Sequence, residues 1–363
     1  MAFSLPSYVP PDFSLLVNSP CIETARVDID GVAPDGYHAM SIFPEYFNVR
    51  GNWTLPEQSR MDCVAVLRGN TIDVVEFRNL HIGDEVVLGR TEDGSEGIYL
   101  HSEGFSKNKE EEDVFAFRGR RSRETAYSRD YDELYELLRY EREHGQITWV
   151  LGPAASFDHD SRLAMSQLIE HGYVDVIFAG NALATHDLEG AIFRTALGQN
   201  IYTQKSQHNG HYNHLDLINM ARRYGSLKKL IEEEVIDGGI MQAALKKGIP
   251  VVLAGSIRDD GPLPSVIGNV YESQDAMRSH IRGTTTVIAL ATQLHTIATG
   301  NITPSYAVRD GTVRPVFIYS IDVCEFALNK LIDRGTLSCK SIATNVQDFL
   351  ALLRNNLVGC KIV

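Results

Sequence analysis

The second part of the chain alternates apolar segments with amphipathic ones, and this alternation restricts the fold more than any other feature. From Gln146 onward, short runs that are apolar on both faces are separated by segments with apolar residues at helical spacing. Strands of this kind belong to a parallel sheet covered by helices on both sides. The expected strands are 147–151, 174–179, 250–254, 286–290, 316–320 and 341–344. The expected helices are 162–171, 188–197, 215–224, 227–234, 240–247 and 325–334.

The first part of the chain is different, with short β-branched or aromatic runs separated by Gly, Asn and Asp turns. Strands are expected at 63–67, 71–77, 85–88 and 114–117, with an acidic loop at 107–113. A chain of 363 residues exceeds one ordinary core. We therefore expect an α/β protein with three parts: a β-rich N-terminal domain (1–125), a connecting segment (126–145) whose helix covers 131–144, and a parallel Rossmann-like sheet (146–363).

Small, amide and acidic residues follow nearly every expected strand, which is where ligands bind in a doubly wound sheet. Glycine lets backbone N–H groups approach a pyrophosphate, and Asn or Ser adds donors at low steric cost. This recurrence indicates a dinucleotide site, although the fingerprint GxGxxG is absent. The residues expected to bind the cofactor are Gly152, Pro153, Ala154, Gly180, Asn181, Ala182, Leu183, Ser256, Ile257, Arg258, Gly300, Asn301, Asp322 and Asn345.

Asp322 has two interpretations of equal weight. It ends an apolar strand, where an acid can receive a ribose diol and thereby favour NAD over NADP. It also precedes an expected helix, where it can act as the N-cap.

Two other kinds of site are disfavoured. His208, His211 and His214 have a spacing compatible with a metal ion, but no Cys joins them, and we expect no metal. Ser256 lies in Gly-Ser-Ile rather than GxSxG, which argues against a hydrolase triad.

The charge balance argues against several partners. The formal charge of −13 repels nucleic acids and anionic lipids, and the basic run 118–123 follows an acidic run that can neutralise it. The five cysteines are scattered, which fits a reducing cytoplasm. No targeting segment or membrane-spanning run is present in the sequence. We expect a cytoplasmic protein that acts on a small molecule and forms a homo-oligomer.

Several long segments resemble one known family. They are GNALATHDLEGAIFRTALG (180–198), GHYNHLDLIN (210–219), GIMQAALKKGIPVVLAGSIRDDGPLPSVI (239–267), LHTIATGN (294–301), NKLIDRG with ATNVQDFL (329–350), DGVAPDGYHAMSIFPEYF (30–47) and QSRMD (58–62). These segments resemble the LOR/SDH-like family, which includes the archaeal-type ornithine cyclodeaminases and the cyclodeaminase module of cyanobacterial arginine dihydrolases. The resemblance covers most of the chain from about Val27.

The resemblance implies that NAD is held by a sheet akin to that of deoxyhypusine synthase and that L-ornithine is converted to L-proline and ammonia. NAD would accept hydride from Cα and later return it, so the reaction has no net redox change. Such a site needs a base for the α-amine, an anion for the δ-ammonium and a cation for the carboxylate. The candidates are Asp187, Asp259 and Asp260 as acids, His186 and His211 as proton carriers, Arg60 and Arg258 as carboxylate partners, and His38 from the first domain.

Structural roles compete with these assignments. Asp187 can cap a helix that begins at Leu188, Arg258 and Asp259 can form an ion pair, and Arg60 can be a solvated charge. The segment 155–160 also departs from the family pattern, which leaves two alternatives open. One is an NAD-dependent deaminase, cyclase or dehydrogenase for another basic amino acid. The other is a non-catalytic module that responds to NAD. If the cyclodeaminase is right, the substrate cleft is expected between the two domains.

Overall fold

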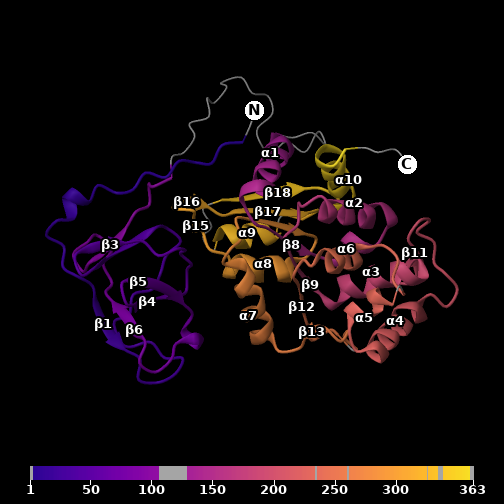
Figure 1. Ribbon diagram of the computed structural model, residues 1–363, viewed down its shortest axis with the longest axis horizontal. Helices are drawn as coiled ribbons and strands as arrows, with labels where there is room; N and C mark the ends of the chain where they lie inside the picture. The colour runs from indigo at the N-terminus through magenta and orange to yellow at the C-terminus, as the bar shows by residue number, and fades with distance from the viewer. Residues whose placement is uncertain are drawn as a thin grey trace.

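The protein consists of a β-rich N-terminal part and a larger α/β part, which lie side by side in the computed structural model (Figure 1). The structure describes residues 3–105, 129–233, 235–259, 261–324, 326–333 and 338–359. The expected strand 114–117, the acidic loop, the basic run and the candidate Asp260 lie outside these residues.

The N-terminal part contains two antiparallel sheets, as expected. The larger one has the order β1-β6-β4-β5, formed by Glu23–Arg26, Glu85–Leu88, Val64–Arg68 and Thr71–Val75. The smaller one has the order β3-β2-β7, formed by Asn52–Thr54, Glu45–Val49 and Ile98–Leu100. All five residues of β2 are buried, and Phe47 and Ile98 are fully enclosed in the core between the sheets.

The α/β part is built on a seven-stranded parallel sheet with the order β13-β12-β9-β8-β14-β17-β18. These strands are Val266–Ile267, Val251–Ala254, Val176–Gly180, Ile147–Leu151, Thr286–Leu290, Phe317–Asp322 and Cys339–Ala343. The six expected strands are all present, so the predicted fold class is confirmed. The chain winds outward from β8 in both directions, which is the Rossmann order, and the winding reverses between β8 and β14.

Ten α-helices are found in the described residues. They are α1 (Arg129–His144), α2 (His159–Glu170), α3 (Asn181–Phe193), α4 (His211–Tyr224), α5 (Leu227–Glu232), α6 (Ile240–Lys247), α7 (Val270–Ile281), α8 (Gln293–Ile302), α9 (Phe326–Asp333) and α10 (Val346–Leu357). Helices α7, α8 and α10 were not expected, and α3 begins seven residues earlier than the expected helix at 188–197. None of the described helices is long and apolar enough to cross a bilayer.

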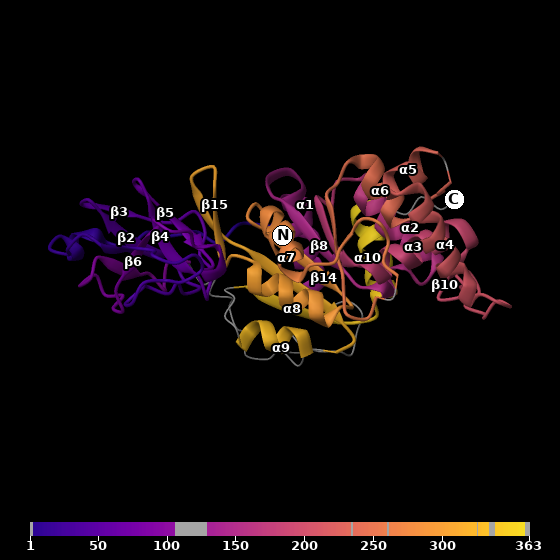
Figure 2. The same ribbon diagram turned by 90° about the horizontal axis from the view of Figure 1, so that it is seen from below.

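The N-terminal part packs against the edge of the parallel sheet where the strands begin. Its contacts include α7, which leads into β14, and the hairpin β15–β16 (Tyr306–Arg309 and Thr312–Pro315), which leads into β17. The Tyr306 hydroxyl donates to the carbonyl of Pro56 at 3.1 Å, and Arg78 forms an ion pair with Asp275. Both views place α3 and α4 on the far side of the sheet from the N-terminal part (Figures 1 and 2).

Candidate nucleotide and substrate site

The crevice at the carboxyl ends of β8 and β14 is the point where this topology places a ligand. The two turns that follow β8 and β14 lie in contact here, because the Gly152 N–H donates to the carbonyl of Leu290 at 2.8 Å. A Cβ on Gly152 would lie 2.0 Å from the carbonyl oxygen of Ala291. Ala291 itself has a φ of 44°, a conformation that costs energy for a residue with a side chain and is often found at functional sites.

Two helices begin at this crevice without a side-chain cap. Helix α3 follows β9 with Gly180 as its N-cap, and α8 follows β14 with Thr292 as its N-cap, and neither cap forms a side-chain hydrogen bond. Their first N–H groups are therefore available to an anion, which the helix dipole also favours. The segment Asn181 to Leu183, expected as a loop, is the first turn of α3, and the Asn181 amide oxygen accepts from the Leu263 N–H at 3.0 Å.

His295, in the first turn of α8, is a crevice residue that the sequence analysis missed. A Cβ on Gly180 would lie 2.9 Å from its Cε1 atom, so glycine is needed to leave room for the imidazole. Burial lowers the pKa of His295, and the nearby carboxylate of Asp259 opposes this shift. Asp259 in turn accepts from the Ser256 N–H at 2.8 Å. The position of His295 soon after a buried strand was the only signal in the sequence.

His186 is held by a carboxylate that was also missed. Its Nδ1 lies 3.0 Å from Oε2 of Glu189, one turn further along α3. Glu189 is fully buried and accepts three more hydrogen bonds, from the Thr195 hydroxyl at 2.7 Å and from the N–H groups of Leu197 and Gly198, both at 3.1 Å. Because every other contact of this carboxylate is a donor, Nδ1 carries the proton, and Nε2 is left as a proton acceptor.

Two rings enclose the His186 imidazole. The Phe157 ring contacts it edge-on with centroids 5.9 Å apart, and the His214 ring of α4 does so at 6.2 Å. Nδ1 of His214 is buried and has no hydrogen-bond partner among the residues the structure describes. An unsatisfied buried nitrogen is costly, so it marks a place where a further polar group is needed.

Asp187 has a structural environment. Its Oδ1 accepts from Nε of Arg162 at 2.8 Å, and its two oxygens accept from the first N–H groups of α6, those of Ile240 at 3.0 Å and Met241 at 2.8 Å. The expectation that Asp187 caps its own helix is wrong, because it lies in the middle of α3 and caps α6 instead.

The other expected cofactor residues differ in placement. Pro153 and Ala154 begin the 3-10 helix η3 (Pro153–Ser156) beside the crevice, whereas Ser256, Ile257 and Arg258 form an exposed loop after β12. No ion pair between Arg258 and Asp259 is found in the described part of the chain. Asp322 accepts from the Cys324 N–H at 3.2 Å in a local turn, and Asn345 caps α10 through the Gln347 N–H at 2.8 Å.

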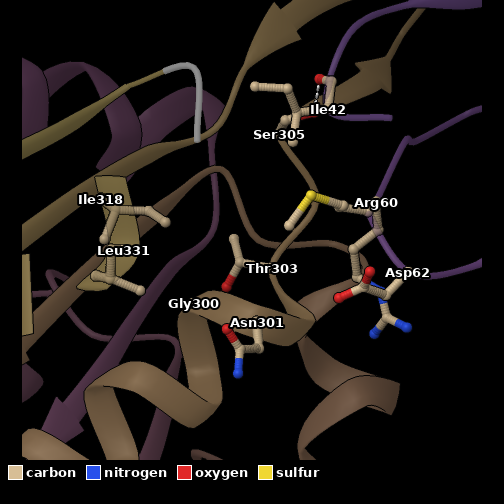
Figure 3. Close-up of a pocket in the computed structure, with 10 residues that line it drawn as sticks. Ile42, Arg60, Asp62, Gly300, Asn301, Thr303, Ser305, Ile318 and Leu331 are labelled. Carbon is tan, nitrogen blue, oxygen red and sulfur yellow. Dashed lines mark hydrogen bonds between the residues drawn. The ribbon is translucent and has the colours of Figure 1, made fainter. Parts of the chain in front are cut away.

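The expectation that Gly300 and Asn301 follow a strand at the crevice is wrong. Both lie in the last turn of α8, about 12 Å along the helix axis from its start at 1.5 Å per residue. Gly300 is needed for packing, because a Cβ there would lie 2.0 Å from Cδ2 of Leu331 in α9. Asn301 lines a cavity of about 30 Å³ between the two parts, opposite Arg60 and Asp62 (Figure 3). That volume holds about two water molecules, too few for an amino acid.

The candidates from the N-terminal part lie far from the crevice. Arg60 is not a solvated charge, since it is largely buried and pairs with Glu76 at 2.6 Å. His38 is buried and lies 2.7 Å from the Glu45 carboxylate. The crevice is at the opposite edge of the sheet, and the five residues of β8 separate the two edges by about 16 Å.

His211 begins α4, and its side chain is exposed with its ring 4.3 Å from that of Tyr212. Within the described ranges, no three His, Cys, Asp or Glu side chains are grouped as a metal site would require.

Comparison with known proteins finds relatives that belong to one family. Residues 133–353 match the family described as the C-terminal Rossmann-fold domain of ArgZ-like arginine dihydrolases. An ornithine cyclodeaminase of Methanocaldococcus jannaschii is 36% identical over 92% of this chain and 77% of its own length. The bifunctional arginine dihydrolase/ornithine cyclodeaminase ArgZ of Synechocystis is 32% identical over 92% of this chain and 46% of its own length.

Solved structures agree with this result. An LOR/SDH protein of Methanococcus maripaludis is 33% identical and has a TM-score of 0.82, covering 93% of this chain and 98% of that one. AgrE, solved as a ternary complex with ornithine and NAD+, is 28% identical with a TM-score of 0.57, covering 95% of this chain and 48% of that one. The family inferred from the sequence motifs is therefore confirmed.

Proposed function

The chain belongs to the archaeal ornithine cyclodeaminase family, and we propose that it converts L-ornithine to L-proline and ammonia with NAD that is regenerated in each turnover. The observation that carries this proposal is the crevice between β8 and β14, at which two helices begin without a side-chain cap, one of them α3, whose second turn carries the carboxylate-bound His186. The ornithine and NAD+ complex of AgrE supports the choice of ligands.

The residues at the crevice fit a dinucleotide. Gly152 and Gly180 allow the strand ends and His295 to lie close together at the crevice, and the first N–H groups of α3 and α8 can receive the pyrophosphate. NAD would supply reversible hydride transfer, taking hydride from Cα of ornithine and returning it to the cyclic imine. The side chains of Asp322 and Asn345 already accept hydrogen bonds from nearby backbone N–H groups. We therefore propose that they stabilise the edge of the crevice and do not contact NAD directly.

We assign the role of base to His186. Nε2 would take a proton from the α-ammonium, since an amine can support loss of hydride only with its lone pair free. Glu189 would stabilise the resulting imidazolium through Nδ1. The same proton can then return to the α-nitrogen as it leaves as ammonia, so His186 ends the turnover as it began. The δ-nitrogen loses two protons before and during ring closure, of which one returns to the ring nitrogen of proline and one goes to the released ammonia or to solvent.

The remaining polar groups of the crevice suit the two ends of the substrate. Asp259 would hold the δ-ammonium and His295 would accept a proton from it. Burial lowers the pKa of His295, which favours the neutral imidazole over the charged one. Arg258, in the same exposed loop, would bind the substrate carboxylate. Asp187 acts as a positioning residue that fixes α3 against α6.

Exposed apolar side chains support a homo-oligomer. Ile257, Leu294 and Val323 follow three different strands at the crevice edge and are 106%, 71% and 76% exposed. Burying such a group against a second copy is favourable. Light scattering should therefore give a mass that is a multiple of the chain's 40.4 kDa, and a monomer would contradict this assignment.

The test is to incubate the purified protein with NAD and L-ornithine, and to follow NADH absorbance while proline and ammonia are assayed. We expect proline and ammonia in equal amounts without accumulated NADH. His186→Gln should abolish turnover while NAD binding persists, and His144→Gln, at the exposed end of α1, should serve as the control. Accumulating NADH would indicate a dehydrogenase, and binding of NAD without any product would indicate a non-catalytic module.

A further inference from the structure

A second cavity lies outside the crevice, between helices α2, α3 and α6. Helix α6 packs against both α2 and α3, and the cavity between the three helices has a volume of about 310 Å³, which is within the range of small-molecule sites. Its lining includes polar side chains of both charges, namely His159, Arg162, Glu170, Arg194, Tyr202 and Asp237. None of these residues has a role in the proposed cyclodeaminase reaction.

Arg162 forms the floor of this cavity. Its Nε and Nη2 atoms donate to the side chain and the carbonyl of Asp187, both at 2.8 Å, while Nη1 has no hydrogen bond to any described residue. The residue is only 5% exposed. Two glycines leave the space that the guanidinium occupies. A Cβ on Gly190 would lie 2.9 Å from Cζ of Arg162, and a Cβ on Gly239 would lie 2.4 Å from its Nη2. A buried cation with one free donor edge suits a carboxylate.

The charges at the rim are unpaired. Arg194 ends α3 with a φ of 58°, a conformation that is unfavourable for a side chain of its size. Across the described residues, neither Arg194 nor the carboxylates of Glu170 and Asp237 form an ion pair. Since Asp187 neutralises Arg162, the cavity presents one uncompensated cation and two uncompensated anions. A complementary ligand has one carboxylate and two positive groups, as a basic amino acid has.

We propose that this cavity is a second binding site for a basic α-amino acid, distinct from the crevice. The ligand's carboxylate binds Nη1 of Arg162 and the guanidinium of Arg194. Its α-ammonium and side-chain cation are held by Asp237 and Glu170. The inference goes beyond the proposed reaction, because it concerns binding without chemistry at a site whose lining includes neither the strand-end glycines Gly152 and Gly180 nor His186.

Isothermal titration calorimetry with L-arginine tests the proposal. L-arginine has the required charges but lacks the free δ-amine that the proposed reaction needs. We expect one binding event per chain in NAD-saturated protein, weakened by about tenfold or more in both Arg194→Asn and Asp237→Asn through loss of a charged hydrogen bond. Asparagine tolerates the positive φ at position 194, so the first variant should fold.

Matched controls separate this site from the crevice. Arg223→Gln and Asp310→Asn change exposed charges away from the cavity and should leave the affinity unchanged. His186→Gln should also bind L-arginine normally, so the result does not depend on whether the protein is a cyclodeaminase. Unchanged affinity in both cavity variants, loss of binding in His186→Gln, or no binding of L-arginine at millimolar concentration would each overturn the proposal.

Discussion

Replacing Glu189 by glutamine tests the assignment of His186 as the base, because it keeps the shape of the side chain and removes its charge. Each oxygen of the Glu189 carboxylate accepts two hydrogen bonds: Oε2 from His186 and Leu197, and Oε1 from Thr195 and Gly198. In Glu189→Gln one of these oxygens is replaced by an NH2 group, which is itself a donor. In either orientation of the amide, this NH2 group lies against the two buried donors that the oxygen had bound. We expect the free energy of unfolding to fall by about 1–3 kcal/mol.

The effect on turnover follows from the charge. A hydrogen bond to a charged group contributes about 1.5–3 kcal/mol, and losing it as the imidazolium forms lowers kcat by about 10- to 100-fold. The assay is proline formation at saturating L-ornithine and NAD, at a temperature where urea unfolding shows the variant to be folded. Glu232→Gln, on the exposed surface of α5, is the matched control. Turnover of folded Glu189→Gln at the wild-type rate would refute the role of His186 as a carboxylate-assisted base.

Three further perturbations test other parts of the structure. Asp187→Asn leaves a buried guanidinium without its counter-charge, so urea unfolding should show a loss of about 3–5 kcal/mol; a loss below about 1 kcal/mol would contradict the buried ion pair. Gly152→Ala should weaken NAD binding measured by fluorescence titration, because the Cβ meets a carbonyl oxygen, whereas Gly268→Ala, with open space around it, should bind NAD normally. The hydrogen bond from Arg78 lowers the pKa of Asp275, so the stabilisation from this pair is present above the ordinary pKa of 3.8 and is lost as the pH falls through the lowered value. Acid unfolding of Asp275→Asn should therefore show a weaker pH dependence than the wild type in this range, and an identical profile would contradict the contact.

The parallel sheet could be predicted because each of its strands is a short apolar run bounded by turn residues. Helix α3 was placed too late, because Gly180 and Asn181 have the composition of a turn and Asp187 that of a cap. Tertiary contacts, and not the local sequence, determine the role of Asp187. The carboxylate of Asp187 caps a different helix 53 residues further along the chain, and no local pattern could reveal that.

The site was predicted in part. Strand-end glycines mark the crevice because close backbone approach has a local sequence signature, and Gly152 and Gly180 are both found there. Gly300 has the same signature for another reason, close packing of two helices, and was misplaced. Glu189 and His295 were missed because their importance depends on what the fold brings to them: four donors in one case and a buried contact with Gly180 in the other.

The proposed reaction requires that hydride leaves Cα of ornithine and returns to it within one turnover. The direct measurement is to supply L-ornithine deuterated at Cα together with unlabelled NAD, and to analyse the proline by mass spectrometry. We expect proline that retains deuterium at Cα, with no build-up of NADH. Proline without the label, or label that accumulates in the nicotinamide while no proline forms, would contradict it.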